Sequence, residues 1–518
     1  WHDPHPKPAY LFALVGGDLA HIEDRFRTMS GRDVTLRIYV EHGKEDRCGY
    51  AMDALKRSMR WDEQAFGREY DLDIFMIVAV SDFNMGAMEN KGLNVFNDKY
   101  VLATPETATD VDYANIEAII AHEYFHNWTG NRITCRDWFQ LCLKEGLTVF
   151  RDQEFSSDMR SRPVTRIADV RGLRAAQFVE DAGPLAHPVR PQSYKEINNF
   201  YTSTVYEKGA EVVRMVQTLI GQEKFRAGMD LYFTRHDGEA ATIEQFIQCF
   251  ADVSRRDMSQ FMLWYAQAGT PEVAVTTKYN AATKTFTLDC KQTLAPTPGQ
   301  PVKQPMVIPL RLGLVGKDGR DLPLFSDGEP AADVIVFKDA AHSFVFTGIA
   351  ERPVLSINRG FSAPIKLVTD LSTDDLAFLA TRDGDPFNRW QALQSIALRL
   401  LIDNVGEIRK GGKSKNDDKL MLALASLVED ASLEPAFMAL ALVPPGEGDI
   451  AREIGRDIDP DAIHRAREAL RCDIGRRLGA ALSTLCERLT VPGGYTPDAA
   501  SAGRRALRNV ALDLMAAD

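Results

Sequence analysis

Two histidines four residues apart, followed by a glutamate, constrain the fold of this chain more than any other feature. The pair stands in His122-Glu-Tyr-Phe-His126, and Glu145 follows after 18 further residues. Residues four apart on an α-helix lie about 40° apart around its axis, so a helix near 114–128 directs both imidazoles to one point. A second predicted helix, near 138–150, must fold back against the first to bring Glu145 to the same point.

These residue types predict a zinc site. Zinc in hydrolases takes three protein ligands and keeps a fourth position for water. The alternative for the histidine pair alone is two surface histidines on a helix, and a glutamate at this spacing disfavours it. We therefore expect one Zn²⁺ per chain, held by His122, His126 and Glu145.

Two further carboxylates lie close to these ligands in the sequence. Glu123 adjoins His122 and is the candidate general base, which accepts a proton from a zinc-bound water as that water attacks a carbonyl carbon. The proton then passes to the leaving amine. Asp152, about two turns after Glu145, is a candidate for orienting a ligand histidine, although a surface aspartate fits its position equally well.

A chain of 518 residues exceeds the size that one hydrophobic core supports, so we expect several domains. The periodicity of the apolar residues predicts the α+β class. Alternation at 34–40 indicates the end of a β-rich unit, 1–43. An apolar strand at 73–80 and several helices follow within 44–269. Short alternating strands at 270–364 predict a small β-sandwich, and amphipathic helices fill 365–518, with a predicted loop at 404–419.

Composition excludes several classes of protein. A net charge of −12 disfavours nucleic acid as a partner, and the longest apolar stretch, near 74–80, is too short to span a bilayer. Seven cysteines without a C-x-x-C pair suggest neither a zinc ribbon nor a disulfide framework. We therefore expect a cytoplasmic monomer with no nucleic-acid or membrane partner.

Three motifs carry a resemblance to a known family. Gly86-Ala-Met-Glu-Asn90, the His122–His126 motif with Glu145, and Tyr206-Glu-Lys-Gly209 together resemble the aminopeptidase N family of gluzincin metallopeptidases, especially its bacterial members. The resemblance covers nearly the whole chain. It implies a thermolysin-like, mostly helical catalytic domain at 44–269, a small β-sandwich at 270–364 and a partial helical (superhelical) domain at 365–518. It also implies that 1–43 is the remnant of an N-terminal β domain and that the chain is truncated at both ends.

The resemblance assigns roles to residues around the metal. Glu89 is implied to bind the free α-ammonium of the substrate. Gly86 and Ala87 are implied to offer backbone hydrogen bonds to the substrate. Tyr206 is implied to donate a hydrogen bond to the oxyanion that forms as the carbonyl becomes tetrahedral. Met88 and Asn90 complete the substrate-binding motif. Met85 and Tyr201 resemble positions that line the pocket for the first side chain, although an apolar core role is equally natural for both.

The expected function is that of a zinc aminopeptidase of broad specificity, which hydrolyses the first residue from peptides with a free N-terminus. A bifunctional epoxide hydrolase shares the zinc pattern, but Gly86-Ala-Met in place of Gly-Gly-Met disfavours it. Glu89 would obstruct the substrate of an endopeptidase. A catalytically silent peptide-binding scaffold is the alternative from another class, and the intact set of His122, Glu123, His126, Glu145 and Tyr206 disfavours it.

Overall fold

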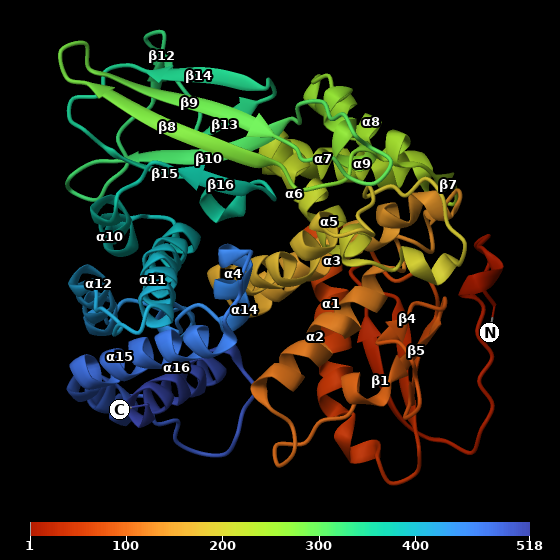
Figure 1. The fold of residues 1–518 in the computed structure, drawn as a ribbon. Helices are drawn as coiled ribbons and strands as arrows, with labels where there is room; N and C mark the ends of the chain where they lie inside the picture. Colours follow the sequence, from red (N-terminus) through yellow and green to blue (C-terminus); the bar gives the residue numbers. More distant parts are fainter. Residues whose placement is uncertain (1, 518) are drawn as a thin grey trace. The chain divides into compact units, whose positions relative to one another are not determined.

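The structure, a computed structural model, describes residues 2–517 and divides into two compact units (Figure 1). Unit 1 comprises the chain up to Thr165 together with Gly172–Thr270 and Leu294–Val307. Unit 2 comprises Arg166–Arg171, Pro271–Thr293 and the chain from Ile308 onward. Helices and strands occur in both units, which confirms the predicted α+β class.

A five-stranded sheet in the order β1-β2-β3-β5-β4 forms one layer of unit 1, with β4 (Ala87–Met88) at its edge. β1 (Ala20–Arg27) and β2 (Asp33–Val40) are antiparallel, whereas β3 (Ile74–Val80) is parallel to both β2 and β5 (Leu93–Asn97). The alternation predicted at 34–40 buries every second residue of β2. β1 and β2 therefore extend the same sheet as β3, and the predicted boundary at residue 43 does not separate two sheets.

Helix α1 (Gly49–Phe66) packs against α2 (Asp110–Phe125), and α2 packs against α3 (Leu141–Met159). α2 also contacts the edge strand β4 of this sheet. Thr109 and Asp112 form a capping box that begins α2, and His126 is the residue that caps its C-terminal end. The helices predicted near 114–128 and 138–150 are thereby confirmed, with α3 continuing to Met159. The other elements of unit 1 are α5 (Phe178–Ala182), α6 (Gly209–Ile220), α7 (Gln222–His236), α8 (Ile243–Ser254), α9 (Leu263–Ala266) and the pair β6 (Thr134–Cys135) and β7 (Ala240–Ala241).

Two strand layers and a helical region make up most of unit 2. One sheet has the order β14-β9-β8-β16 and the other β13-β10-β15. Their strands are β8 (Glu272–Asn280), β9 (Thr285–Thr293), β10 (Ile308–Val315), β13 (Val334–Phe337), β14 (Ala341–Phe346), β15 (Val354–Ile357) and β16 (Lys366–Thr369), with a short hairpin of β11 (Phe325–Ser326) and β12 (Glu329–Pro330). The strands predicted at 272–277, 285–291 and 334–337 are confirmed.

The helices of unit 2 correct one prediction, the loop at 404–419. α11 (Pro386–Arg409) continues through the first part of that segment because Val405 and Ile408 prolong its buried apolar face. The loop is confined to the residues before α12 (Asp418–Glu429), and Asn404 bonds to the backbone N–H and C=O of Lys415. The remaining helices are α10 (Thr373–Arg382), α13 (Pro435–Leu442), α14 (Glu447–Ile454), α15 (Pro460–Arg488) and α16 (Ala499–Ala516); α4 (Arg162–Gly172) includes the residues 166–171 of this unit.

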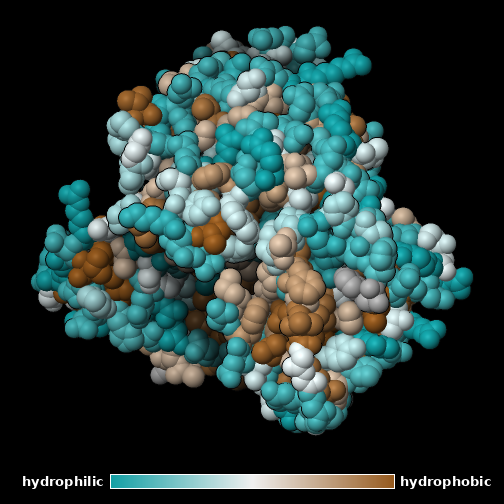
Figure 2. Space-filling view, turned by 90° about the vertical axis from the view of Figure 1, so that its right-hand side faces the viewer, coloured by the Kyte–Doolittle hydropathy of each residue, from teal (hydrophilic) through white to brown (hydrophobic). Residues whose placement is uncertain are grey.

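Figure 2 shows a face on which hydrophilic side chains predominate, interrupted by separate apolar patches. Phe12 and Leu14, in the segment before β1, are among the large apolar side chains that are exposed to solvent. Within residues 2–517, no helix has both the length and the apolar character needed to cross a bilayer. All seven cysteines are free thiols.

Candidate active site

The three predicted metal ligands meet where the end of α2 faces the first turns of α3. The Nε2 atoms of His122 and His126 lie 3.0 Å apart. Oε2 of Glu145 lies 3.5 Å from Nε2 of His122 and 3.2 Å from Nε2 of His126. His126 and Glu145 are buried, and His122 retains a small exposed fraction. The structure therefore brings the ligand atoms of all three residues together.

Each histidine is oriented by its other ring nitrogen. Nδ1 of His122 lies 2.6 Å from Oδ2 of Asp152, and Nδ1 of His126 lies 2.9 Å from the carbonyl oxygen of Thr129. These oxygens accept hydrogen bonds, so Nδ1 carries the proton and the lone pair of Nε2 points toward Glu145. The contact with Asp152 favours the orienting role of that residue over the surface alternative.

The donor set of this site fits zinc. Two imidazole nitrogens and one carboxylate oxygen lie within 4.8 Å of one another, and they are the ligand types that catalytic zinc sites use. Oε2 of Glu145 is buried without a hydrogen-bond partner. A buried carboxylate oxygen costs free energy unless something compensates its charge, and a cation held with the two Nε2 atoms would do so.

Glu123 and Glu89 adjoin the three ligands. Carboxylate oxygens of both residues lie within 4.8 Å of each other and of a ring nitrogen of His126. Oε2 of Glu123 is buried and has no hydrogen-bond partner, and this burial raises the pKa of Glu123 to about 8. The candidate base and the candidate amine-binding carboxylate thus face the same point as the metal ligands.

Lys144 is a site residue that the sequence analysis missed. Its side chain is 2% exposed, and its Nζ donates to Oε1 of Glu89 at 2.7 Å and to Oε1 of Glu145. Burial alone would raise the pKa of Glu89, but the charge of Lys144 holds it below its ordinary value. A lysine beside a ligand glutamate on a helix normally reaches solvent, so nothing local in the sequence indicates that this one is buried.

The Gly86–Asn90 segment forms the edge of the sheet. In β4 (Ala87–Met88), the two residues pair with Phe96 and Val95 of β5, and the carbonyl oxygen of Gly86 accepts a hydrogen bond from the N–H of Asn97 at 2.9 Å. The side chain of Asn90 donates to the carbonyl of Tyr10 at 3.4 Å. Because β4 is the last strand in the sheet order, one of its edges has no neighbouring strand.

Of the two predicted site tyrosines, Tyr206 lies beside His122 and Tyr201 lies beside Tyr206. The ring of Tyr206 stacks on the ring of His122 with centroids 6.4 Å apart, and the ring of Tyr201 lies 6.1 Å from that of Tyr206. Burial raises the pKa of Tyr206, so its hydroxyl remains protonated. Met85 is 49% exposed, which contradicts the core alternative for that residue. Tyr201 is partly buried.

Two glycines bring the Tyr206 segment against α3, the helix that carries Glu145. Gly146 follows Glu145 in α3, and Gly209 begins α6 directly after the π-helical turn Thr204–Lys208. A Cβ atom at Gly146 would lie 2.7 Å from the carbonyl carbon of Gly209. The two backbones therefore touch at a distance that only glycine permits. The close approach places Tyr206 near Glu145, and the sequence analysis missed it.

Comparisons with known proteins match the chain along most of its length. Residues 50–265 match the peptidase family M1 domain, residues 269–370 a domain of unknown function (DUF3458) with an Ig-like fold, and residues 373–518 its C-terminal companion with ARM repeats. The chain is 55% identical to aminopeptidase N of Caulobacter vibrioides and 49% identical to aminopeptidase N of Escherichia coli, over 100% of this chain and 59% of each relative. The chain therefore spans about 59% of the length of these two relatives.

A solved structure also resembles the chain. Legionella pneumophila aminopeptidase A, in complex with aspartic acid, superposes with a TM-score of 0.87 at 30% sequence identity. The match covers 100% of this chain and 58% of that structure. The fold and the sequence thus point to the same group of proteins.

Proposed function

We propose that the chain, whose residues 50–265 match the peptidase family M1 domain, is a zinc aminopeptidase that hydrolyses the first residue from peptides with a free N-terminus. His122, His126 and Glu145 are the proposed zinc ligands, with one ion per chain. When bound, zinc supplies Lewis-acid chemistry: it polarises a carbonyl oxygen and lowers the pKa of water.

One observation carries the proposal. The carboxylates of Glu89 and Glu123 and a ring nitrogen of His126 lie within 4.8 Å of one another. A carboxylate that binds an ammonium this close to the candidate base and a metal ligand leaves room for one residue before the cleaved bond. An endopeptidase needs open space there for the preceding residues of its substrate.

The side chains of the chain then have separable roles. The partnerless oxygen of Glu123 accepts the proton of the attacking water and returns it to the leaving amine. The hydroxyl of Tyr206 donates to the carbonyl oxygen as negative charge develops on it. Asp152 and the Thr129 carbonyl orient the histidines. Gly86, Ala87, Met88 and Asn90 are proposed to hold the substrate backbone along the edge of β4, and Met85 and Tyr201 to line the pocket for the first side chain.

The experiment is a hydrolysis assay of zinc-loaded protein with a panel of aminoacyl chromogenic substrates. A matched N-acetylated substrate is the control for the free amine. Cleavage of the free-amine substrates with little cleavage of the acetylated one is the expected result. Equal cleavage of both, or none at full zinc occupancy, would contradict the proposal; the second result would favour the silent scaffold.

Other properties stay predictions of the sequence. They are the domain boundaries at residues 43, 269 and 364, the cytoplasmic location and the monomeric state. Broad specificity for the first residue is also proposed, because the exposed Met85 offers a flexible apolar contact at the edge of the site.

A further inference from the structure

Asp71, outside every predicted motif, accepts hydrogen bonds from residues on both sides of the candidate site. It lies between α1 and β3, and its side chain is 6% exposed. Nζ of Lys91 donates to its two carboxylate oxygens at 2.6 and 2.8 Å, and Nδ2 of Asn127 donates to Oδ1 at 3.1 Å. Lys91 also donates to Oδ1 of Asn127 at 2.6 Å. The three side chains therefore form a closed triangle of hydrogen bonds.

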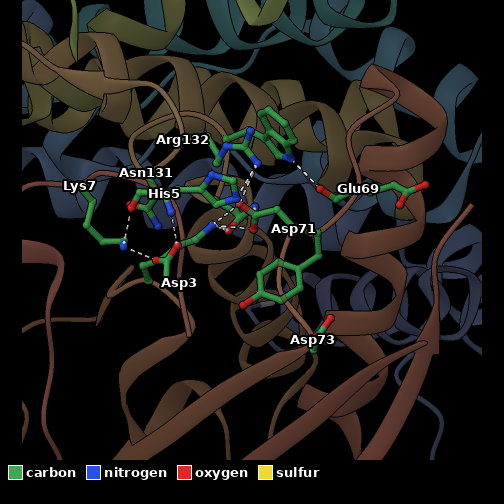
Figure 3. Close-up of polar contacts among 12 residues, drawn as sticks. Asp3, His5, Lys7, Glu69, Asp71, Asp73, Asn131 and Arg132 are labelled. Carbon is green, nitrogen blue, oxygen red and sulfur yellow. Dashed lines mark hydrogen bonds and ion pairs between the residues drawn. The ribbon is translucent and has the colours of Figure 1, made fainter. Parts of the chain in front are cut away.

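Two further side chains close the cluster around Asp71. Nη1 of Arg132 donates to Oδ2 of Asp71 at 3.0 Å, and Nε2 of His5 lies 3.4 Å from the same oxygen (Figure 3). Arg132 is itself held by a bidentate contact with Asp237. The carboxylate of Asp71 is thus approached by four side chains from three chain segments, and its position is strongly determined.

The two principal partners of Asp71 adjoin site residues. Lys91 stands two residues after Glu89, and Asn127 directly follows His126. A second link runs in parallel, because Nδ2 of Asn131 donates to the carbonyl oxygen of Glu89 at 3.0 Å while its N–H bonds to the carbonyl of His126. The segment after β4 and the loop after α2 are therefore joined by side chains as well as by the fold.

Burial makes this link stiff. The side chain of Lys91 is 1% exposed. Burial alone would raise the pKa of Asp71, but Lys91 holds it below its ordinary value, so the carboxylate stays ionised beside the ammonium. A buried ion pair that is also hydrogen-bonded tolerates little displacement, because either charge without its partner is strongly destabilising. Such a pair keeps two segments at a constant separation.

We propose that Asp71 is a positioning residue which, through Lys91 and Asn127, sets the separation between Glu89 and His126. It thereby determines how strongly the site prefers a free N-terminus over a blocked one. The inference rests on the proposed function, in which Glu89 binds the substrate ammonium. Asp71 itself touches neither substrate nor metal.

The test measures binding, so that it does not depend on turnover. All proteins carry Glu123→Gln and are loaded with zinc, and calorimetry gives Kd for leucyl-alanine and for its N-acetylated form. Asp71→Asn is expected to lower the ratio of the two affinities by about 10-fold or more, since small misplacements of a binding group are costly. Asn127→Ala, which removes a single link, is expected to lower it by a smaller factor.

A matched control separates positioning from general destabilisation. Glu117, on α2, is also a buried carboxylate of unit 1, and its partners Arg57 and Arg160 belong to α1 and to the C-terminal end of α3. Glu117→Gln is expected to lower the melting temperature without changing the affinity ratio. If Asp71→Asn fails to fold, the double variant Asp71→Asn/Lys91→Met removes both buried charges together and tests the same link.

The outcomes distinguish the two proposals. If the protein with Asp71 intact binds both peptides equally, the proposed function is wrong. If it prefers the free amine and the folded Asp71 and Asn127 variants keep that preference, the positioning role is overturned. A fall of the ratio in Glu117→Gln equal to that in Asp71→Asn would also overturn it, because any loss of stability would then have the same effect.

Discussion

At the scale of single residues, Glu123 separates metal binding from chemistry. The hydrogen bonds that orient His122 and His126 do not involve the Glu123 carboxylate. One oxygen of this carboxylate has no hydrogen-bond partner. Glu123→Gln is therefore expected to retain zinc and to lose about 10²–10⁴-fold in kcat, the usual contribution of general acid–base catalysis. Metal analysis and steady-state kinetics on the same sample measure both quantities. Retained kcat in the zinc-replete variant would mean that another group is the base.

Substitution of Glu89 tests whether this residue causes the proposed preference for substrates with a free N-terminus. Glu89→Gln removes one charge-assisted hydrogen bond to the substrate ammonium, worth about 1.5–3 kcal/mol. The ratio of kcat/KM for free and N-acetylated substrates is therefore expected to fall by roughly 10-fold or more. The acetylated substrate is the internal control, since it never formed the ion pair. An unchanged ratio would place recognition of the ammonium elsewhere.

Asp152 should act on zinc affinity through His122. Asp152→Asn weakens the hydrogen bond that holds the His122 ring, and loss of such a partner typically lowers metal affinity about 10–100-fold. Asp158→Asn is the control: it lies on the same helix but bonds to Trp61 and Arg162. Competition with a chelator measures the zinc Kd of both variants. Equal affinities in the two would remove the orienting role from Asp152.

At the scale of helices, the contact between α3 and α6 determines where Tyr206 lies. Gly146→Ala would place a methyl group 2.7 Å from the backbone of Gly209, so the helices must separate. We expect a loss of about 1–3 kcal/mol in the free energy of unfolding, as for other overpacked sites, together with lower kcat.

A helix glycine without near neighbours is the control for this substitution. An added Cβ at Gly479, inside α15, meets nothing within 4 Å. Gly479→Ala should therefore stabilise the protein or leave it unchanged, because alanine favours helix. Denaturant unfolding and kinetics measure both variants. If Gly146→Ala is as harmless as Gly479→Ala, the close approach does not position Tyr206.

At the scale of the whole molecule, the proposed zinc ligands all lie in unit 1. Free zinc at 100 times its Kd would stabilise the folded state by about 2.7 kcal/mol. We therefore expect removal of zinc by a chelator to lower the melting temperature of the unit 1 transition by several degrees, at roughly 2–4 °C per kcal/mol. Calorimetry checks this, and His122→Ala should show a much smaller shift. Equal shifts in both proteins would contradict the ligand assignment.

The sequence alone determined those features that depend on local spacing. Alternation of apolar and polar residues predicts β2. The spacing of four residues between His122 and His126 predicts that both lie on one face of α2. The types of these residues and of Glu145 predict zinc chemistry before any contact is known. The α+β class follows from the same patterns along the chain.

Only the tertiary structure decided which distant segments meet. Pairing of β2 with β3 joins the strands β1 and β2 to the sheet, although the pattern of a strand does not specify its neighbour. Three further contacts could not be predicted from the sequence. They are the burial of Lys144 between Glu89 and Glu145, the hydrogen-bonded triangle of Asp71, Lys91 and Asn127, and the contact of Gly146 with Gly209. A charged or glycine residue has the same local pattern whether it lies at the surface or in the core. Its role depends on long-range packing, which supplies the partners that offset its burial.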